Sequence, residues 1–375
     1  MQNTDCEVNA TDSTMEKSVR TQRVHGGNII DAIARYGIDE KDIIDFSSNV
    51  NPLGPSSAAK RAIKRSLSSI DQYPEPHSIG LRKAIARYFG IKPEQVICGN
   101  GSNSLIHLIP RAFRPKKVLI PVPTFAEYAA AIEDVGGEVV PLSLDEAEGF
   151  RVDPLEMAFA LKGMDMAFLC NPNNPTGRLI PKAEMLEIAT YALKEGVRLV
   201  VDEAFMDFDE APAIIKEAVE FSHLICLRAF TKFYGMPGLR VGYGVSNDET
   251  IARLIEAQEP WSVSIPAEQA AAAAMNDWKY CKKTRRVILK ERERLLEELR
   301  ILPGIHPFPS VANFLFIRLA SIDAQTLTRK LGLRNILVRD CSSFPGLGNR
   351  YIRIAVRTRR ENKQLLKALR DILIA

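Results

Sequence analysis

Short apolar runs alternate with segments of helical periodicity between residues 95 and 245. The runs are four to six residues long, which is the length of a buried strand, and they occupy 95–98, 117–122, 138–142, 166–170, 198–202, 224–229 and 240–245. Helix-like segments lie between them, near 103–113, 126–135, 182–195 and 211–221. Strands that alternate with helices at this spacing predict an α/β fold with a doubly wound, mostly parallel sheet.

The pattern changes after Pro260. A long charged amphipathic helix is expected to about residue 299, followed by strands at 312–319, 335–339 and 351–357 and by helices near 323–331 and 361–373. This order favours a smaller C-terminal α+β domain. The predicted division is a flexible arm at 1–24, a covering arm at 25–50 that contributes to the small domain, a large domain at 51–260 and a small domain at 261–375.

Composition narrows the function classes. The 375 residues are 46% hydrophobic and 26% charged, which is ordinary globular usage, and the net charge of +4 is too small for a nucleic-acid-binding surface. No apolar stretch approaches the roughly 18 residues of a membrane span, and residues 1–24 lack the apolar core of a secretory signal. We therefore expect a cytoplasmic protein without nucleic-acid or membrane partners.

Four polar or glycine-rich clusters follow predicted strands directly: GNGS at 99–102, NPNNPTG at 171–177, DEAF at 202–205 and TKFYGMPGLR at 231–240. In an open α/β sheet, ligands bind outside the carboxyl ends of the strands. The clusters are therefore expected to meet in one site.

Each cluster also has a structural explanation when taken singly. The GNG segment is typical of a tight turn, Asp202 of a helix cap, and Lys232 of a solvated surface charge. Together they fit a narrower chemistry. A lysine able to form a Schiff base, a carboxylate thirty residues upstream and a glycine turn that opens a helix are what pyridoxal phosphate requires.

Longer stretches carry a resemblance to a known family. They are HGGN at 25–28, DFSSNVNPLG at 45–54, GNG at 99–101, PTFAEY at 123–128, NPNNPTG, DEAFMDF at 202–208, TKFYGMPGLRVGY at 231–243, ANFLF at 312–316 and CSSFPGLGNRYIRIAVR at 341–357. Through them, residues 25–375 resemble the fold-type I pyridoxal-phosphate enzymes, in the branch of the histidinol-phosphate aminotransferases. Within that branch, HGGN and FPGL make the chain most similar to the threonine-phosphate decarboxylases.

The resemblance implies pyridoxal 5'-phosphate as the cofactor, with no metal, and assigns residues to its ring. Lys232 would hold the cofactor covalently and then transfer protons, and Asp202 would pair with the pyridine nitrogen. Asn174 would donate to the phenolic oxygen, and Phe125 would stack on the ring face.

The cofactor phosphate is expected at the start of the helix that follows GNG. Its implied ligands are Gly101, Ser102, Thr231 and Arg240, together with Tyr73 of a neighbouring subunit. The role of Tyr73 implies a homodimer with shared active sites.

Arg339 and Arg353 lie in apolar strand-like runs, where a guanidinium needs an anionic partner. An internal salt bridge, or a surface arginine that extends its charged end to solvent, is one explanation. The other is a pair of guanidinium groups that bind the carboxylate and the phosphate of a substrate. The resemblance adds His25, Gly26, Asn49 and Asn174 as further substrate ligands.

The implied reaction is the decarboxylation of O-phospho-L-threonine, or of O-phospho-L-serine, to the amino-alcohol phosphate used in cobalamin nucleotide-loop assembly. One departure matters for this choice, because Phe205 stands where the superfamily usually has a tyrosine that donates to the phenolic oxygen. The alternatives are an aminotransferase acting on histidinol phosphate and a non-catalytic protein that binds pyridoxal phosphate.

Overall fold

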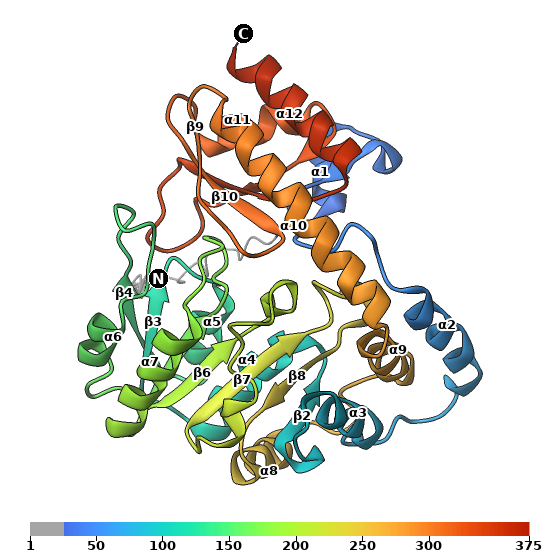
Figure 1. Cartoon of the computed structure of the whole chain (residues 1–375), viewed down its shortest axis with the longest axis vertical. Coiled ribbons are helices and arrows are strands. Elements are labelled where there is room, and N and C mark those ends of the chain that lie inside the picture. The colour runs from blue at the N-terminus through green and yellow to red at the C-terminus, as the bar shows by residue number, and fades with distance from the viewer. Residues whose placement is uncertain (1–25, 375) are drawn as a thin grey trace, which may run out of the picture.

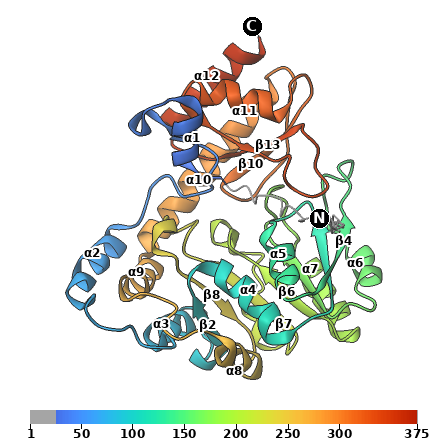
Figure 2. The ribbon, with the colours of Figure 1, turned by 180° about the vertical axis from the view of Figure 1, so that it is seen from behind.

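The computed structural model describes residues 26–374. Its ribbon has a larger lower part and a smaller upper part, and the long helix α10 (Trp278–Arg300) runs from one to the other (Figure 1). The larger part is built on a seven-stranded sheet and the smaller on a four-stranded sheet. The view from behind shows α1 (Ile29–Tyr36) with the upper part, although it lies early in the chain (Figure 2).

The larger sheet has seven strands. In spatial order they are β2 (Val96–Gly99), β8 (Gly242–Val245), β7 (Leu224–Ala229), β6 (Arg198–Asp202), β5 (Met166–Cys170), β3 (Lys117–Val122) and β4 (Glu138–Ser143). The five strands from β7 to β4 pair in parallel, and only β8 runs antiparallel to its neighbours β2 and β7. The predicted α/β fold with a mostly parallel sheet is confirmed.

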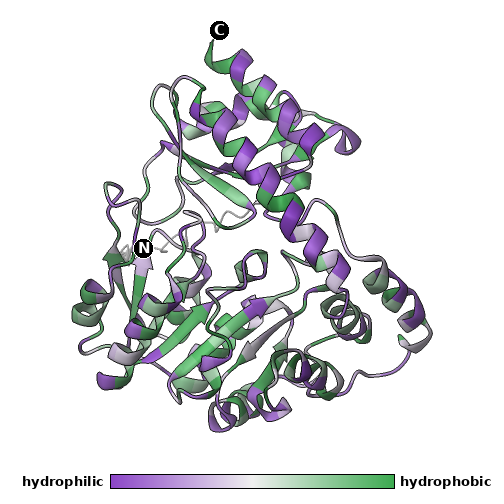
Figure 3. Cartoon of the chain, viewed as in Figure 1, coloured by the Kyte–Doolittle hydropathy of each residue, from purple (hydrophilic) through white to green (hydrophobic). Residues whose placement is uncertain are grey.

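Helices cover both faces of this sheet, because successive strand residues point to opposite sides. In β5, Phe168 and Cys170 belong to the apolar core under the helices α4 (Gly101–Phe113), α5 (Glu127–Glu133) and α8 (Asp248–Ala257). Ala167 and Leu169 belong to the opposite core, under α3 (Ile79–Phe89), α6 (Pro154–Ala160), α7 (Lys182–Lys194) and α9 (Ile265–Met275). The apolar strands are green in Figure 3 because both of their faces are buried.

The smaller sheet is antiparallel, in the order β12 (Arg339–Asp340), β13 (Tyr351–Ala355), β10 (Phe314–Leu319) and β9 (Ile305–Pro307). The helices α11 (Ala324–Gly332) and α12 (Arg359–Leu373) share its apolar core with the second half of α10. The short strand β1 (Ile44–Asp45) pairs in parallel with β11 (Ile336–Leu337) and so joins the early residues to this part. The remaining helix, α2 (Ser57–Ser66), packs against α9 beside the larger sheet.

Three sequence predictions of local structure are wrong. The expected helix at 211–221 is only a short 3-10 turn, Glu217–Val219, because the amide of Ile214 donates to the buried carboxylate of Glu203 instead of to a helical carbonyl. The single helix expected to residue 299 is two helices, separated where Asp277 caps α10. The strand expected at 335–339 divides between two sheets, as β11 and β12.

Candidate active site

The carboxyl ends of β2, β5, β6 and β7 meet at one edge of the seven-stranded sheet. Since β8 is antiparallel to both β2 and β7, those two strands point the same way as the rest. The four clusters predicted from the sequence therefore lie at one edge, and the smaller part of the molecule stands above it (Figure 1).

Asp202 ends β6 and is buried, with both carboxylate oxygens held by hydrogen bonds. The hydroxyl of Tyr128 donates to Oδ2 at 2.8 Å, and the amide of Ala204 donates to Oδ1 at 2.9 Å. Burial raises the pKa of Asp202, while these two donors and the charge of Lys232 oppose that rise. The arrangement suits a carboxylate that is kept for a cationic partner in the cleft.

Lys232 follows β7 and is half-buried, with its Nζ 5.9 Å from the centre of the Phe205 ring. Burial, together with the nearby charges of Arg353 and Arg240, lowers its pKa from 10.5 to about 8, while the charge of Asp202 opposes the shift. A lysine with a lowered pKa has a larger neutral fraction at physiological pH, and the neutral amine is the form that attacks a carbonyl.

Gly101, Ser102 and Arg240 form an open cradle at the start of α4. Gly101 has a φ of +73°, and a Cβ there would lie 2.6 Å from Nη2 of Arg240. A Cβ on Gly242 would lie 2.3 Å from the amide nitrogen of Ser102. The backbone is therefore accessible only because these positions are glycines, and the guanidinium lies beside the positive end of the helix. Together with the buried Thr231, this set fits a phosphate group.

Asn174 and Phe125 lie in the loops that follow β5 and β3. Asn174 is buried, and its Oδ1 accepts a hydrogen bond from Nη1 of Arg353. This contact leaves the Nδ2 group of Asn174 as the donor for a ligand, and its predicted role stays a prediction. The Phe125 ring lies edge-on to Tyr128, with 5.6 Å between ring centres.

Arg339 and Arg353 are directly opposite one another, because they are register partners in the antiparallel pair of β12 and β13. Both are buried, and among residues 26–374 neither has a carboxylate oxygen within 4.0 Å. Arg339 contacts the hydroxyl of Ser343 at 2.8 Å, and Arg353 donates to the carbonyl of Ser47 at 2.9 Å. Burial lowers the pKa of Arg353 to about 10, and the charge of Arg339 adds to that effect. The internal salt bridge considered from the sequence is thus not found in this part of the chain.

Ser47 connects Gly26 with Arg353. A Cβ on Gly26 would lie 2.3 Å from the carbonyl oxygen of Ser47, which is the oxygen that accepts from Arg353. Asn49 is buried, and its Oδ1 has no hydrogen-bond partner in the described residues. His25, the remaining predicted ligand, lies outside the described residues.

Tyr73 is separate from these groups. Its side chain is 82% exposed, and its ring lies 5.2 Å from that of Trp261. Because its expected role belongs to a second subunit, that role stays a prediction.

A buried ionic cluster beneath the site was missed by the sequence analysis. Arg228 donates to Glu203 at 2.9 Å and to Asp207 at 2.7 Å, and all three side chains are buried. Burial raises the pKa of Asp207 to about 6, with the charge of Arg228 opposing. The signal was present, because an arginine in the apolar run LICLRA needs an anionic partner as much as Arg339 does.

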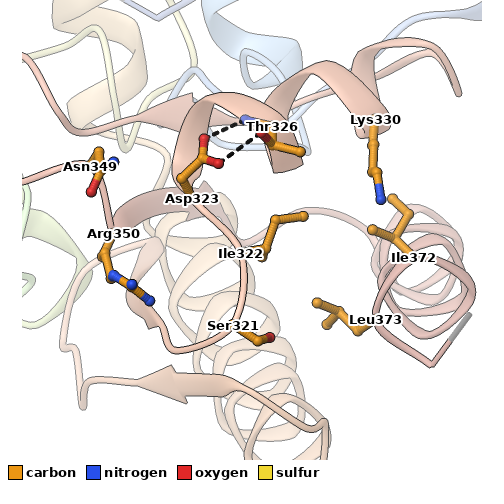
Figure 4. A pocket seen from close by; sticks show the side chains of 9 residues that line it. All are labelled: Ser321, Ile322, Asp323, Thr326, Lys330, Asn349, Arg350, Ile372 and Leu373. Atoms are coloured by element: carbon orange, nitrogen blue, oxygen red, sulfur yellow. Dashed lines mark hydrogen bonds between the residues drawn. The ribbon is translucent and has the colours of Figure 1, made fainter.

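A hollow of about 620 Å³ lies elsewhere, on the smaller part between α11 and α12, and includes none of the predicted ligands (Figure 4). Its acidic group, Asp323, is occupied in capping α11 through Thr326. Within residues 26–374, no helix is long and apolar enough to cross a membrane, and no group of three metal-ligating side chains is found.

Comparisons with known proteins agree with this geometry. The family model "Aminotransferase class I and II" matches residues 41–369. A threonine-phosphate decarboxylase of Salmonella typhimurium is 37% identical over 352 residues, which are 93% of this chain and 96% of that protein. Among solved structures, a histidinol-phosphate aminotransferase of Clostridium acetobutylicum superposes with a TM-score of 0.83 at 33% identity, covering 88% of this chain and 98% of the other. An L-threonine-O-3-phosphate decarboxylase of Porphyromonas gingivalis gives a TM-score of 0.80 at 29% identity, covering 88% of this chain and 99% of the other.

Proposed function

Because this chain belongs to the family of class I and class II aminotransferases, whose enzymes use pyridoxal 5'-phosphate, we propose that it decarboxylates O-phospho-L-threonine or O-phospho-L-serine. The product would be an amino-alcohol phosphate, for assembly of the cobalamin nucleotide loop. The similarity to the decarboxylases of Salmonella and Porphyromonas supports this choice.

One observation carries the proposal: Arg339 and Arg353 face each other, buried, with no carboxylate within 4.0 Å in the described residues. Two guanidinium groups on facing strands repel each other unless an anion lies between or beside them. A phospho-amino acid carries both a carboxylate and a phosphate, so a single small molecule supplies an anionic group for each arginine. We infer that these arginines are the substrate's anion ligands, with Asn49 and Gly26 beside them.

The chemistry divides between the cofactor and the chain. When bound, pyridoxal phosphate supplies an electron sink for the bond that breaks at the substrate's Cα. Asp202 would hold the proton on the ring nitrogen, and Gly101, Ser102, Thr231 and Arg240 would bind the phosphate.

Lys232 would be the residue that holds the cofactor covalently, and its amine would hold the proton that replaces the carboxylate at the substrate's Cα. The arginines fix the direction of the bond to that carboxylate, and this direction decides which bond breaks. Asn174 would connect the cofactor with the substrate-binding Arg353, since its Oδ1 accepts from Arg353 and its Nδ2 is free to donate to the ring oxygen.

Phe205 favours decarboxylation over transamination in this proposal. It is buried, lies beside Lys232 and packs edge-on against Phe314, with 5.1 Å between ring centres. A phenyl ring cannot donate a hydrogen bond, so Asn174 is left as the side chain proposed to donate to the cofactor's phenolic oxygen. The alternative, a histidinol-phosphate aminotransferase, is favoured by the likeness to the Clostridium structure.

A side-by-side assay distinguishes these functions. Purified holoprotein is incubated with O-phospho-L-threonine, with O-phospho-L-serine, and with histidinol phosphate plus 2-oxoglutarate, and carbon dioxide and glutamate are measured. Carbon dioxide release without 2-oxoglutarate supports the proposal. Glutamate formation from histidinol phosphate supports the aminotransferase, and bound cofactor without either product supports a non-catalytic binding protein.

We also propose a homodimer, in which Tyr73 of one subunit reaches the phosphate cradle of the other. Its high exposure in the single chain is consistent with that role. Tyr73→Phe is expected to weaken cofactor binding without changing the sedimentation coefficient of the dimer. A monomeric wild-type protein with full cofactor content would contradict the idea.

A further inference from the structure

Tyr128 lies directly behind Asp202, and no role for it follows from the family resemblance described above. Its side chain is fully buried in the first turn of α5. We propose that Tyr128 is a positioning residue, which fixes the carboxylate of Asp202 and sets how strongly that carboxylate holds the proton on the cofactor's ring nitrogen. The inference rests on the proposed function, in which Asp202 pairs with that nitrogen.

The hydrogen-bond geometry is the first support. Tyr128 and Ala204 each occupy one oxygen of Asp202, at 2.8 and 2.9 Å, so the plane of the carboxylate is fixed from two sides. A carboxylate has about four acceptor directions, so two remain for a ligand in the cleft. A carboxylate held in this way is oriented before a ligand arrives.

The packing of the Tyr128 ring is the second support. The ring stacks on Phe168, with 5.2 Å between centres and 14° between planes. Its edge meets Phe125, the side chain proposed to cover the cofactor ring. Because aromatic contacts hold it on two sides, the hydroxyl cannot turn away from Asp202. The same residue thus links both proposed contacts of the cofactor ring.

The electrostatic environment shows what the hydroxyl does. The titratable groups that interact electrostatically with Asp202 are Tyr128, Lys232, Glu203 and Cys170. Burial raises the pKa of Asp202, and the Tyr128 hydroxyl is the first of the groups that lower it. The pKa of Tyr128 itself lies well above 10, because it is buried beside Asp202, so the phenol stays protonated and acts as a donor.

A defined consequence follows for the ring nitrogen. Without the Tyr128 hydroxyl, the anionic form of Asp202 loses one of its two fixed donors, and the proton shared with the ring nitrogen moves toward the carboxylate. The cofactor then withdraws electrons less effectively. The affected quantity is kcat, because the hydroxyl does not contact the substrate.

The test uses holoprotein reconstituted with pyridoxal phosphate labelled with ¹⁵N in the ring, without substrate. Solid-state NMR reports the protonation of that nitrogen through its chemical shift. Tyr128→Phe keeps the ring and removes only the hydroxyl, and it is expected to move the ¹⁵N signal toward the neutral pyridine value. It is also expected to lower kcat roughly 10- to 100-fold, the effect of one hydrogen bond to a charged group, with KM nearly unchanged.

A second replacement tests the opposite direction. With 3,5-difluorotyrosine at position 128 the hydroxyl is a stronger donor to Asp202, so the ¹⁵N signal is expected to move further toward the value of the protonated nitrogen than in the wild type. This measurement decides the question even if Tyr128→Phe does not fold. Tyr243→Phe is the matched control, because Tyr243 is also buried but packs on Phe230 and Phe89.

The outcomes separate this inference from the proposed function. An unchanged ¹⁵N shift in folded Tyr128→Phe, or with the fluorinated residue, would show that Tyr128 only fills space. A wild-type holoprotein that releases no carbon dioxide would contradict the proposed function, while the shift measured without substrate would still report on Tyr128.

Discussion

Replacing Arg339 by methionine is expected to make the substrate-free protein more stable and less active. Arg339 and Arg353 are buried register partners without a carboxylate in reach in the described residues, so the free protein contains two facing cations. Methionine fills similar space in an apolar run and removes one charge. The same change removes an anion ligand of the proposed substrate.

The size of the stability change follows from opposing terms. Two unit charges about 6 Å apart at an effective dielectric constant of about 20 repel by roughly 3 kcal/mol. Arg339 regains part of this through the Phe344 ring and the Ser343 hydroxyl, contacts worth about 1–2 kcal/mol together. The net gain for the variant is about 1–2 kcal/mol. With an unfolding entropy of about 0.8 kcal/mol/K for a chain of this length, Tm rises by roughly 1–3 °C.

The expected loss of activity is larger. Truncating one partner of a buried charge pair costs about 2–5 kcal/mol, which is roughly 30- to 5,000-fold in kcat/KM. Carbon dioxide release from O-phospho-L-threonine measures it, and cofactor absorbance should be unchanged. Arg350→Met is the matched control, because Arg350 is exposed in the neighbouring loop and should change neither quantity. A fall in Tm of several degrees for Arg339→Met would show that the guanidinium stabilises the fold, and the reasoning would fail.

Three further predictions concern the cofactor residues and the core. Because the pKa of Lys232 is about 8, the rate at which apoprotein recombines with pyridoxal phosphate should rise from pH 7 to 9 and then level off. A rate that still rises above pH 10 would contradict the lowered pKa. Lys232→Ala should yield folded protein with no borohydride-reducible link to the cofactor. Gly101→Ala should weaken cofactor binding at least tenfold by equilibrium dialysis, because the added methyl group meets the Arg240 guanidinium at 2.6 Å; unchanged affinity would place the phosphate elsewhere. Arg228→Met should lower the free energy of unfolding by about 3–5 kcal/mol in urea titrations, since it leaves buried carboxylates unpaired. That loss of stability should be smaller at pH 5.5 than at pH 8. The pKa of Asp207 in the folded state is raised to about 6 or above, so at pH 5.5 the buried carboxyl keeps a proton that the unfolded chain releases near pH 4. Equal losses at both pH values would refute this reasoning.

Much of the larger sheet follows from the sequence because its strands are buried on both faces. The expected strands at 117–122, 166–170, 198–202 and 224–229 have the bounds found in the structure. Continuous apolar runs between polar turns leave little freedom in such a sheet. The gathering of the polar clusters at one edge follows from the same parallel order.

The parts that could not be predicted depend on single polar contacts between distant segments. The helix expected at 211–221 is absent because the Glu203 carboxylate takes the Ile214 amide, a contact that periodicity does not report. The facing register of Arg339 and Arg353 depends on how a divided strand pairs, which the run NILVR does not specify. Tyr128 stands in a stretch quoted for its family resemblance, but nothing in the sequence indicates that its hydroxyl reaches residue 202.

The last residue of β6 and the residue after it are neighbouring carboxylates with opposite surroundings. Asp202 faces Tyr128 and the cleft, whereas Glu203 faces Arg228 in the core on the other side of the sheet. Moving this dipeptide to another scaffold would therefore require both halves of its environment, a polar cavity above and a buried cation below. A one-residue insertion in β6 would exchange the two acids, placing the structural one in the cleft and the reactive one in the core. For protein engineers, the length of this strand must therefore stay fixed, because it sets the side of the sheet to which each acid points.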